Sequence, residues 1–305
     1  MSGRALLTPK VLIPFAIATL IWGSTWLVIR DQLGVVAPTW SVAYRFAVGS
    51  AAMFAWAAIR RDPLTLDRPG YMFALLFGVF QFVLNFNFVY RAEAHITSGL
   101  VAVVFALLLV PNAIFSRLLL KTPLSPRFLL GSVVALCGVG LLIVQEVRSD
   151  PSSATETWLG VILTISGILS ASAANIMQGT ARGRALPMSA MLAWGMLFGA
   201  AINAALGWAT VGPPTIELRP AYIFGVLYLG VLASAVAFTC YFAVIRAVGP
   251  ALAAYSSIIT PVLAMILSTL FEGYRWSLLA AAGGVVAVVG LLIALSARRP
   301  VTKSG

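Results

Sequence analysis

Charged residues are scarce in this chain. Only 10% of its 305 residues are Asp, Glu, Lys or Arg, whereas 61% are hydrophobic. Soluble domains carry about 25% charged and about 45–50% apolar residues. The mean hydropathy of +0.99 excludes an ordinary soluble core, because so much apolar surface could not be buried in one. A lipid bilayer is the natural solvent for this chain, and an unusual lipoprotein is the remaining alternative.

Cysteine and histidine are nearly absent. Cys137 and Cys240 both fall within long hydrophobic runs, and His95 is the only histidine. No ligand cluster accompanies the thiols, so we expect neither a disulfide nor a metal site. A single histidine at the end of a run cannot activate a serine at mid-membrane. We therefore expect no cofactor and no enzyme; an integral membrane enzyme is the alternative from a different class, and loss of His95 would inactivate it.

Long hydrophobic runs are what the chain has in abundance. Each holds about 20 residues, enough for a helix to cross a hydrocarbon core of about 30 Å. The first run lacks the small-residue cleavage site of a signal peptide. The remaining loops leave no room for a soluble domain, so the sequence predicts an all-α polytopic membrane protein with ten transmembrane helices. The ten runs are 11–29, 39–59, 70–90, 96–119, 127–145, 157–179, 187–209, 219–244, 250–271 and 276–296.

The basic residues predict how these helices are oriented. With the N-terminus inside, fourteen Lys and Arg side chains fall in inner segments, five fall in outer segments, and Arg45 lies within a run. Cytoplasmic loops are enriched in these residues. The bias explains the net charge of +11 without a nucleic acid partner. It predicts that both termini are cytoplasmic and that the 145–157 loop is external.

The chain contains a loose internal repeat. GVGLLIV at 138–144 matches VVGLLIA at 288–294, and Pro111 matches Pro261 at the same offset. We therefore divide the chain into a first repeat, residues 1–150, and a second repeat, residues 151–305. Five helices per copy is an odd number, so the second copy must cross the membrane in the opposite direction.

Inverted repeats predict a function as well as a fold. They are typical of secondary transporters, which bind substrate near the midplane between the two halves. Pro111 and Pro261 each remove a helical hydrogen bond, and we expect both to act as hinges. Small residues at helical spacing predict close packing of the fifth and tenth helices. These small residues are Gly131, Ala135, Gly138, Gly283, Ala287 and Gly290.

Two stretches resemble a known family. WGSTWLVIRDQLGVVAPTWSVAYRF (22–46) has Trp-Gly-Ser in the first run, a Pro before the second run and an Arg-Phe within it. SSIITPVLAMILSTLFEGYRWSLLAAAGGVVAVVGLLI (256–293) has a Pro-Val, an acidic residue before the last run and a Gly-Leu-Leu end. Both are similar to EamA-type members of the drug/metabolite transporter superfamily, and the resemblance covers nearly the whole chain.

The resemblance implies ten helices in two inverted five-helix repeats and transport of small metabolites through a central cavity. YddG-like members of this family export amino acids, aromatic ones among them, and this is the activity we expect. Export of other metabolites or drugs, such as nucleosides, purines or cationic compounds, is the alternative. The two copies differ, because Lys121 and Thr122 stand where the second copy has Glu272. Equal roles in the two halves therefore cannot be assumed.

Acidic residues are absent from the middle of the membrane. All nine lie in loops or at the ends of the runs. The resemblance makes this informative, because small multidrug transporters of the same superfamily use a membrane-embedded glutamate for cations and protons. We expect facilitated or exchange transport of a neutral zwitterion, with little dependence on a proton gradient.

Polar residues within the runs are the first binding candidates, because such residues usually face a bundle interior or a wet cavity. Gln81 and Asn85 are four residues apart on one face of the third run, which Asn87 does not share, and Asn175 lies in the sixth. Amides both donate and accept hydrogen bonds, which suits a zwitterion. Tyr228 and Tyr241 in the eighth run are further candidates. For each residue, a purely structural bond between helices is the alternative.

Two indoles and one guanidinium complete the candidates. Trp22 and Trp26 share a face of the first run, and Trp22 lies too deep for the interfacial aromatic belt. An indole offers flat apolar area and one donor, although core packing is the alternative. Arg45 lies about two turns into the second run, where it could clamp a carboxylate. We favour a structural role for Arg45, in which it pairs with backbone carbonyls or extends toward the surface.

Together these features predict a multi-pass transporter of the bacterial inner (plasma) membrane that works by alternating access. Its expected partners are a small-molecule substrate, in particular an amino acid, and the lipid bilayer. We expect it to function as a monomer. The sequence leaves open the exact substrate, the direction of transport, the coupling ion, the oligomeric state and the side that is open at rest.

Overall fold

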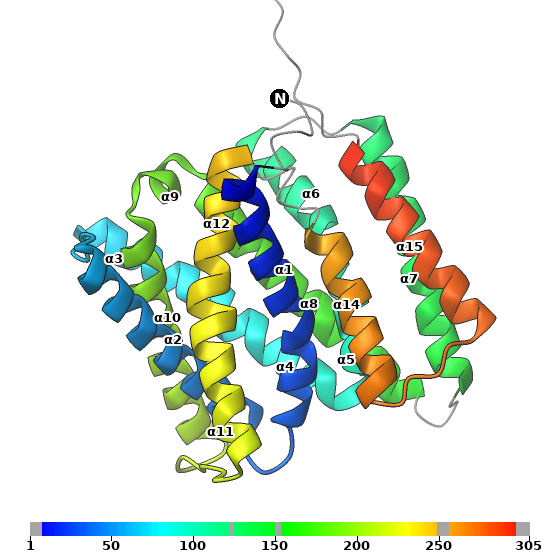
Figure 1. The fold of residues 1–305 in the computed structure, drawn as a ribbon, viewed down its shortest axis with the longest axis horizontal. Coiled ribbons are helices and arrows are strands. Elements are labelled where there is room, and N and C mark those ends of the chain that lie inside the picture. The colour runs from blue at the N-terminus through cyan, green and yellow to red at the C-terminus, as the bar shows by residue number, and fades with distance from the viewer. Residues whose placement is uncertain (1–7, 122–124, 150–153, 249–255, 297–305) are drawn as a thin grey trace, which may run out of the picture.

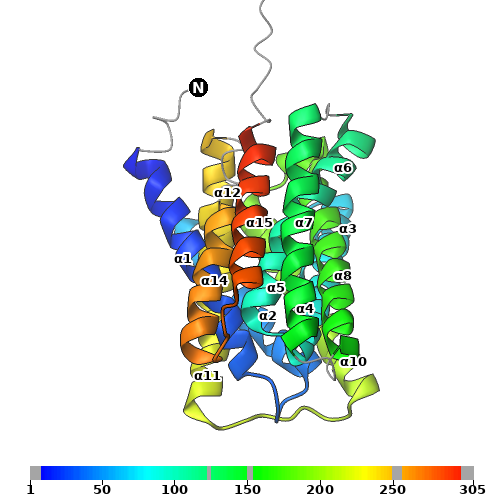
Figure 2. The same cartoon turned by 90° about the vertical axis from the view of Figure 1, so that its right-hand side faces the viewer.

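The computed structural model describes residues 8–121, 125–149, 154–248 and 256–296, and every regular element in these ranges is a helix (Figure 1). The helices form one bundle, in which α1 (Pro9–Asp31) begins and α15 (Leu278–Ser296) ends at the same end (Figure 2). Following the predicted topology, we call this the inner end and the opposite one the outer end. The chain termini and the middle of the 145–157 loop lie outside the described residues.

The first repeat supplies five spans, two of which consist of several helical segments. They are α1; α2 (Pro38–Arg60); a third span of α3 (Arg68–Gly78), a π-helix (Val79–Leu84) and α4 (Asn85–His95); a fourth span of α5 (Ser98–Phe105), a 3-10 turn (Ala106–Leu108) and α6 (Leu109–Leu120); and α7 (Pro126–Ser149). Proline occupies the first turn of α1, α2 and α3, where its missing N–H leaves no helical bond unmade.

The second repeat follows the same plan. Its helices are α8 (Ala154–Gly179), the short α9 (Ala181–Ala185), α10 (Met188–Thr210), an eighth span of α11 (Pro220–Leu227), a π-helix (Tyr228–Val236) and α12 (Ala237–Val248), then α14 (Ser256–Phe271) and α15. The third and eighth spans, which are counterparts in the two repeats, therefore both have a π-helical middle. Neither π-helix was predicted from the sequence.

The expected transmembrane helices are all present. Within the described residues, eight are long and apolar enough to cross a membrane, and two shorter apolar helices, Ile259–Phe271 and Leu278–Ala294, stand at the ninth and tenth positions. The ten-helix, two-repeat architecture predicted from the sequence is confirmed. The chain is a multi-pass membrane protein.

The helices α7 and α15 pack against each other backbone to backbone. A Cβ atom on Gly131 would lie 2.2 Å from the Ala294 nitrogen, and one on Gly138 would lie 2.2 Å from the Ala287 nitrogen. Only glycine permits this approach, which supplies van der Waals contact where lipid gives no hydrophobic driving force. The described residues that line the central cavity all come from other helices, so this pair has the packing role that its small residues predicted.

The helices α2 and α10 join the two repeats on the other side of the bundle (Figure 1). Ser50 Oγ donates to the carbonyl oxygen of Ala193 at 2.9 Å. Gly230, in the second π-helix, lies so close to α2 that an added Cβ would be 2.6 Å from the Val48 side chain. This contact holds α2 against the eighth span at the level of Arg45, the buried cation of the bundle.

Candidate functional site

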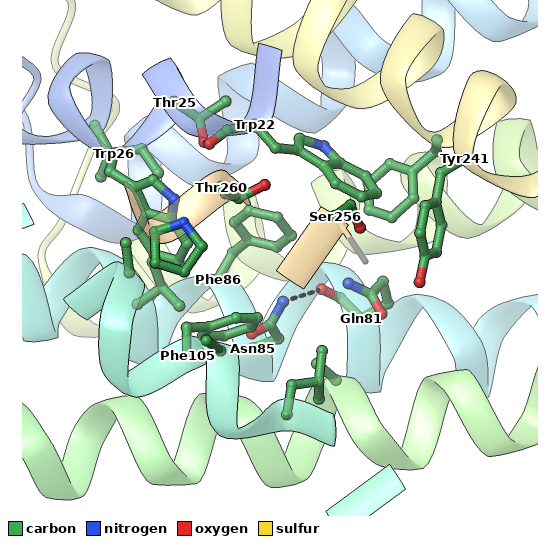
Figure 3. Close-up of a pocket in the computed structure, with 18 of the residues that line it drawn as sticks. Trp22, Thr25, Trp26, Gln81, Asn85, Phe86, Phe105, Tyr241, Ser256 and Thr260 are labelled. Atoms are coloured by element: carbon green, nitrogen blue, oxygen red, sulfur yellow. Dashed lines mark hydrogen bonds between the residues drawn. The ribbon is translucent and has the colours of Figure 1, made fainter. Parts of the chain in front are cut away.

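A cavity of about 150 Å³ lies at the centre of the bundle (Figure 3). Its walls come from α1, α2 and the third and fourth spans of the first repeat, and from α8, α12 and α14 of the second. An engineered protein cavity of about this size holds one benzene molecule. The space therefore accommodates a small molecule or a single aromatic ring.

Most of the predicted binding residues line this cavity. They are Trp22, Trp26, Arg45, Gln81, Asn85, Asn175 and Tyr241, joined by the proposed hinge Pro261. Two predicted residues lie elsewhere. Pro111 lies in α6, shortly after the 3-10 turn. Tyr228 packs against α1, where its hydroxyl is 2.5 Å from Ser24 Oγ, and it borders a separate crevice at the outer end.

The Trp-Gly-Ser motif forms part of the seam between the repeats. Trp22 Nε1 donates to the carbonyl oxygen of Ala233 at 3.1 Å, within the second π-helix. At Gly23, an added Cβ would lie 2.8 Å from the side chain of Leu263 in α14. Each residue of the motif, Ser24 included, thus contacts the second repeat. The motif positions α1 against that repeat while its first indole reaches the cavity.

Aromatic rings form the apolar part of the wall. The Trp22 ring lies 5.4 Å from Phe238 and 4.9 Å from Tyr241, measured between centroids. Trp26 lies 5.4 Å from Phe105 and is 9% exposed. Its indole N–H has no hydrogen-bond partner among the described residues. Trp26 therefore brings both apolar area and an unused donor to the site.

Arg45 is 2% exposed, and its guanidinium is only partly satisfied. Its Nε donates to Ser234 Oγ at 3.2 Å, and its Cζ lies 4.3 Å from the centre of the Phe86 ring, within cation–π range. Its Nη1 has no hydrogen-bond partner in the described part of the chain. The protein therefore anchors one side of the guanidinium and leaves Nη1 buried without a described partner.

The third span places two amides in the cavity. Gln81 lies in the π-helix and Asn85 directly after it, and Asn85 Nδ2 donates to the Gln81 carbonyl oxygen at 3.4 Å (Figure 3). The Oδ1 atom of Asn85 has no hydrogen-bond partner among the described residues. Asn87 instead bonds Asn203 at 2.6 Å, outside the cavity lining. The different face expected for Asn87 is therefore what the structure shows.

The second repeat contributes polar groups near the inner end. Asn175 Nδ2 donates to Asn112 Oδ1 at 3.4 Å, which links α8 to α6. Tyr241 lies on α12 beside Trp22. Asn175 and Tyr241 therefore bring polar groups of the second repeat to the cavity wall.

Sequence reasoning missed much of the wall. The missed residues are Ile29, Phe86, Val89, Ala102, Phe105, Ala106, Leu108, Ala171, Phe238, Ser256 and Thr260. Most of them are apolar, and apolar residues occur on every face of a membrane helix, so their pattern does not separate cavity from lipid. Ser256 and Thr260 are the polar exceptions, and both precede Pro261 in α14.

The unpartnered atoms of the cavity define what it can bind. Arg45 Nη1 and Trp26 Nε1 are donors, and Asn85 Oδ1 is an acceptor. A buried polar atom left without a partner costs about 1–3 kcal/mol, and more if it is charged. A small ligand that carries an acceptor, a donor and an apolar part would satisfy all three atoms and the aromatic wall.

Comparison with known proteins identifies relatives over nearly the whole chain. PagO of Salmonella typhimurium strain LT2 is 26% identical over 294 residues, which are 96% of this chain and 95% of PagO. The uncharacterized inner membrane transporter YedA of Escherichia coli strain K12 is 28% identical over 255 residues, 82% of this chain and 79% of YedA. The uncharacterized transporter YdfC of Bacillus subtilis strain 168 is 24% identical over 290 residues, 93% of this chain and 90% of YdfC.

Solved structures and a family profile agree with these relatives. One crystal structure superposes with a TM-score of 0.69 at 22% identity and covers 95% of this chain and 98% of that one, which shows a shared fold. The profile of the EamA-like transporter family matches twice, at residues 10–144 and 158–296. The two matches correspond to the two copies of the repeat. The chain belongs to the EamA-like transporter family.

Proposed function

We propose that this transporter exports amino acids, aromatic ones among them, across the bacterial inner membrane by alternating access through the central cavity. The observation that carries the proposal is the set of unpartnered polar atoms on an aromatic wall. Arg45 Nη1 and Trp26 Nε1 are donors for a carboxylate, and Asn85 Oδ1 is an acceptor for an ammonium group. A zwitterion satisfies both kinds of atom with one molecule.

Charge favours a carboxylate over a neutral acceptor at Arg45. Hydrogen bonds to a charged group contribute about 1.5–3 kcal/mol, against about 0.5–1.5 kcal/mol for neutral pairs. The guanidinium lies in a site with little water, since Arg45 is nearly fully buried. An entering carboxylate therefore compensates the buried charge, which a nucleoside or a cationic drug would not do.

The apolar part of the substrate would lie against Trp22, Phe105 and Phe238. The cavity of about 150 Å³ holds a ring of benzene size, so a whole aromatic amino acid needs the walls to move apart. Such widening is what alternating access provides. We propose Pro111 and Pro261 as the points where the fourth span and α14 bend, since proline weakens a helix locally. The direction, export, rests on the family resemblance.

Counterflow into proteoliposomes tests this proposal. Phenylalanine, phenethylamine and 3-phenylpropionate share one ring but carry both charged groups, only the ammonium, or only the carboxylate. We expect phenylalanine to be transported, and both analogues to compete at least tenfold less well. Preferred transport of a nucleoside or a cationic dye, with no transport of any amino acid, would contradict the proposal and favour the alternative substrates.

A further inference from the structure

The outer end of the bundle holds a cluster of charged and polar residues outside the cavity lining, in which Glu93 and Ser98 are buried while the Arg30 side chain is 42% exposed. Its members are Arg30 at the end of α1, Glu93 in the last turn of α4, Ser98 at the start of α5 and Glu272 directly after α14. Arg30 donates to the main-chain oxygen of Glu93, and its Nε lies 3.9 Å from Glu272 Oε1. Ser98 Oγ donates to Glu272 Oε2 at 2.6 Å. These contacts, which we call the outer cluster, tie the first repeat to the second.

Glu93 is the anomaly in this cluster. Its side chain is 0% exposed, and neither carboxylate oxygen has a hydrogen-bond partner among the described residues. Transferring an unpaired carboxylate out of water is so costly that such a group takes up a proton instead. The sequence placed Glu93 at the end of a span, where water would be expected, and did not predict this burial.

Two arginines lie near Glu93, but neither pairs with its carboxylate. Arg30 uses its guanidinium on the Glu93 main chain and on Glu272. Arg45 is directed to Ser234 and to the face of Phe86. Among the described residues, no ion pair joins either arginine to the Glu93 side chain.

The other charged or titratable groups around Glu93 also leave it unpaired. Tyr90 lies one turn earlier on α4 and donates to Gln32 Oε1 at 3.0 Å. Glu272, from the second repeat, accepts a hydrogen bond from Ser98. His95, two residues on, is bonded to Glu156 of α8. The cluster thus holds two carboxylates, of which only Glu272 is paired.

We propose that Glu93 is a proton-binding site that controls the outer gate. With the outer cluster closed, Glu93 holds a proton; when the cluster separates, water reaches the carboxyl group and the proton leaves to that side of the membrane. Protonation then favours the closed form and ionisation the open form. Glu93 does not line the cavity, so the proton exchanges with one side only. The site controls access and is compatible with transport that no proton gradient drives.

The proposal predicts how opening depends on pH. One proton separates the two forms, so the ratio of open to closed molecules rises up to tenfold per pH unit on the outer side, across the range where only the closed form is protonated. The sign is fixed: raising the pH opens the gate. Arg219 at the outer surface cannot produce this effect, because its bonds to Asp31 and Glu217 raise its pKa further and it stays charged.

The gate can be tested without any substrate, by measuring how fast introduced cysteines react with a thiol reagent. The result therefore does not depend on the proposed function. In a C137S/C240S background, Ile29→Cys reports on the buried cavity wall beside Arg30 and is 2% exposed before substitution. Val35→Cys, at a position 68% exposed in the loop after α1, corrects for the pH dependence of the thiol itself. The probe is a membrane-impermeant quaternary ammonium thiosulfonate, applied from the side on which Val35→Cys reacts. Val89→Cys, on the same wall, is the second reporter.

We expect the labelling rate of Ile29→Cys, divided by that of Val35→Cys, to rise at least tenfold between pH 5.5 and pH 8. Glu93→Gln, which cannot ionise, should hold the ratio at its low-pH value. Glu93→Asp keeps a carboxyl group and should keep the rise, as should the control His95→Gln, which removes the histidine bonded to Glu156. A flat ratio in the wild type overturns the proposal, as does an unchanged rise in Glu93→Gln. Loss of the rise in His95→Gln would assign the effect to His95 instead.

Discussion

The third and eighth spans are counterparts in the two repeats, and each has a π-helical middle, Val79–Leu84 and Tyr228–Val236. The π-helix of the third span and the residue after it turn the amides of Gln81 and Asn85 into the cavity. The π-helix of the eighth span instead receives side chains from the first repeat. Its Ala233 carbonyl accepts from Trp22, and its Ser234 hydroxyl accepts from Arg45.

The same kind of backbone segment, a π-helix, therefore has two different roles in the two repeats. A π-helix inserts a wide turn and often marks a functional site in a helix. In the third span it directs amides into the cavity; in the eighth it bonds Trp22 and Arg45, which line the cavity from the first repeat. The two halves share a fold but not the chemistry of their side chains. The effect of a substitution on transport should therefore depend on whether the residue faces the cavity itself or positions a residue that does.

Arg45 should show the largest effect, because it is held by the eighth span and is the group proposed to bind the substrate carboxylate. Loss of a charged hydrogen bond costs about 1.5–3 kcal/mol, so Arg45→Gln should weaken amino acid binding roughly ten- to a hundredfold or more. Arg45→Lys keeps the charge but loses the fork and should retain part of the affinity. Half-saturation measured by counterflow checks this, with an amine lacking a carboxylate as the control substrate. Equal losses for both substrates would show that Arg45 is structural.

Replacement of Gln81 should have the second-largest effect, because the third span places its amide directly in the cavity. Gln81→Ala leaves the zwitterion less well paired at about 1–3 kcal/mol, roughly ten- to a hundredfold in affinity. The loss should be the same for phenylalanine and threonine, because both have the same charged ends. Asn87→Ala is the matched control, since Asn87 bonds Asn203 outside the cavity lining and should alter stability without altering affinity. Wild-type affinity in Gln81→Ala would show that the amide only packs helices.

Trp22 should separate large substrates from small ones. Aromatic pairs contribute about 0.5–1.5 kcal/mol beyond area burial, so Trp22→Ala should weaken phenylalanine transport roughly two- to tenfold and threonine transport much less. Trp22→Phe keeps a ring but loses the N–H that binds the Ala233 carbonyl. It should therefore spare phenylalanine more than Trp22→Ala does. Equal effects on both substrates would assign Trp22 to the seam alone.

Replacement of Ser234 tests whether the eighth span acts by positioning Arg45. Ser234→Ala removes one partner of Arg45, and we expect a loss of about 1 kcal/mol, roughly fivefold in affinity, for substrates with a carboxylate. Because Ser234 acts through Arg45, the double variant Ser234→Ala with Arg45→Gln should be no worse than Arg45→Gln. Additive losses in this double-mutant cycle would show that the two residues act independently.

Much of this fold could be predicted from the sequence, because the governing physics is local. Hydrophobic length sets the ten helices, and the small residues of α7 and α15 set their contact. The spacing of Gln81 and Asn85 placed both on one face, and the π-helix did not separate them. Asn87 was correctly placed on another face.

The rest depends on contacts between distant segments. Nothing in VFQFVL or YLGVLASAV distinguishes a π-helix from an α-helix, because both satisfy the backbone internally. Tyr228 was a sound candidate by polarity, yet α1 packs over it and Ser24 takes its hydroxyl. Glu93 lies at the end of a span, and its burial comes from helices distant in sequence that pack around α4, which the local sequence does not reveal.

Pro111 and Pro261 occupy matching positions in the two repeats, and their replacement should change transport least. Pro261 lies inside a continuous α14 and on the cavity wall, whereas Pro111 follows a 3-10 turn that already interrupts the fourth span. If bending is the role of both, Pro261→Ala should restore a hydrogen bond and stiffen α14, because no other interruption exists within that helix. Pro111→Ala leaves the 3-10 turn in place and should slow transport less. Single-turnover rates at saturating substrate measure this, and unchanged half-saturation distinguishes slower bending from weaker binding. Equal slowing in both variants would mean that the 3-10 turn depends on Pro111, and wild-type rates in both would show that the prolines only pack.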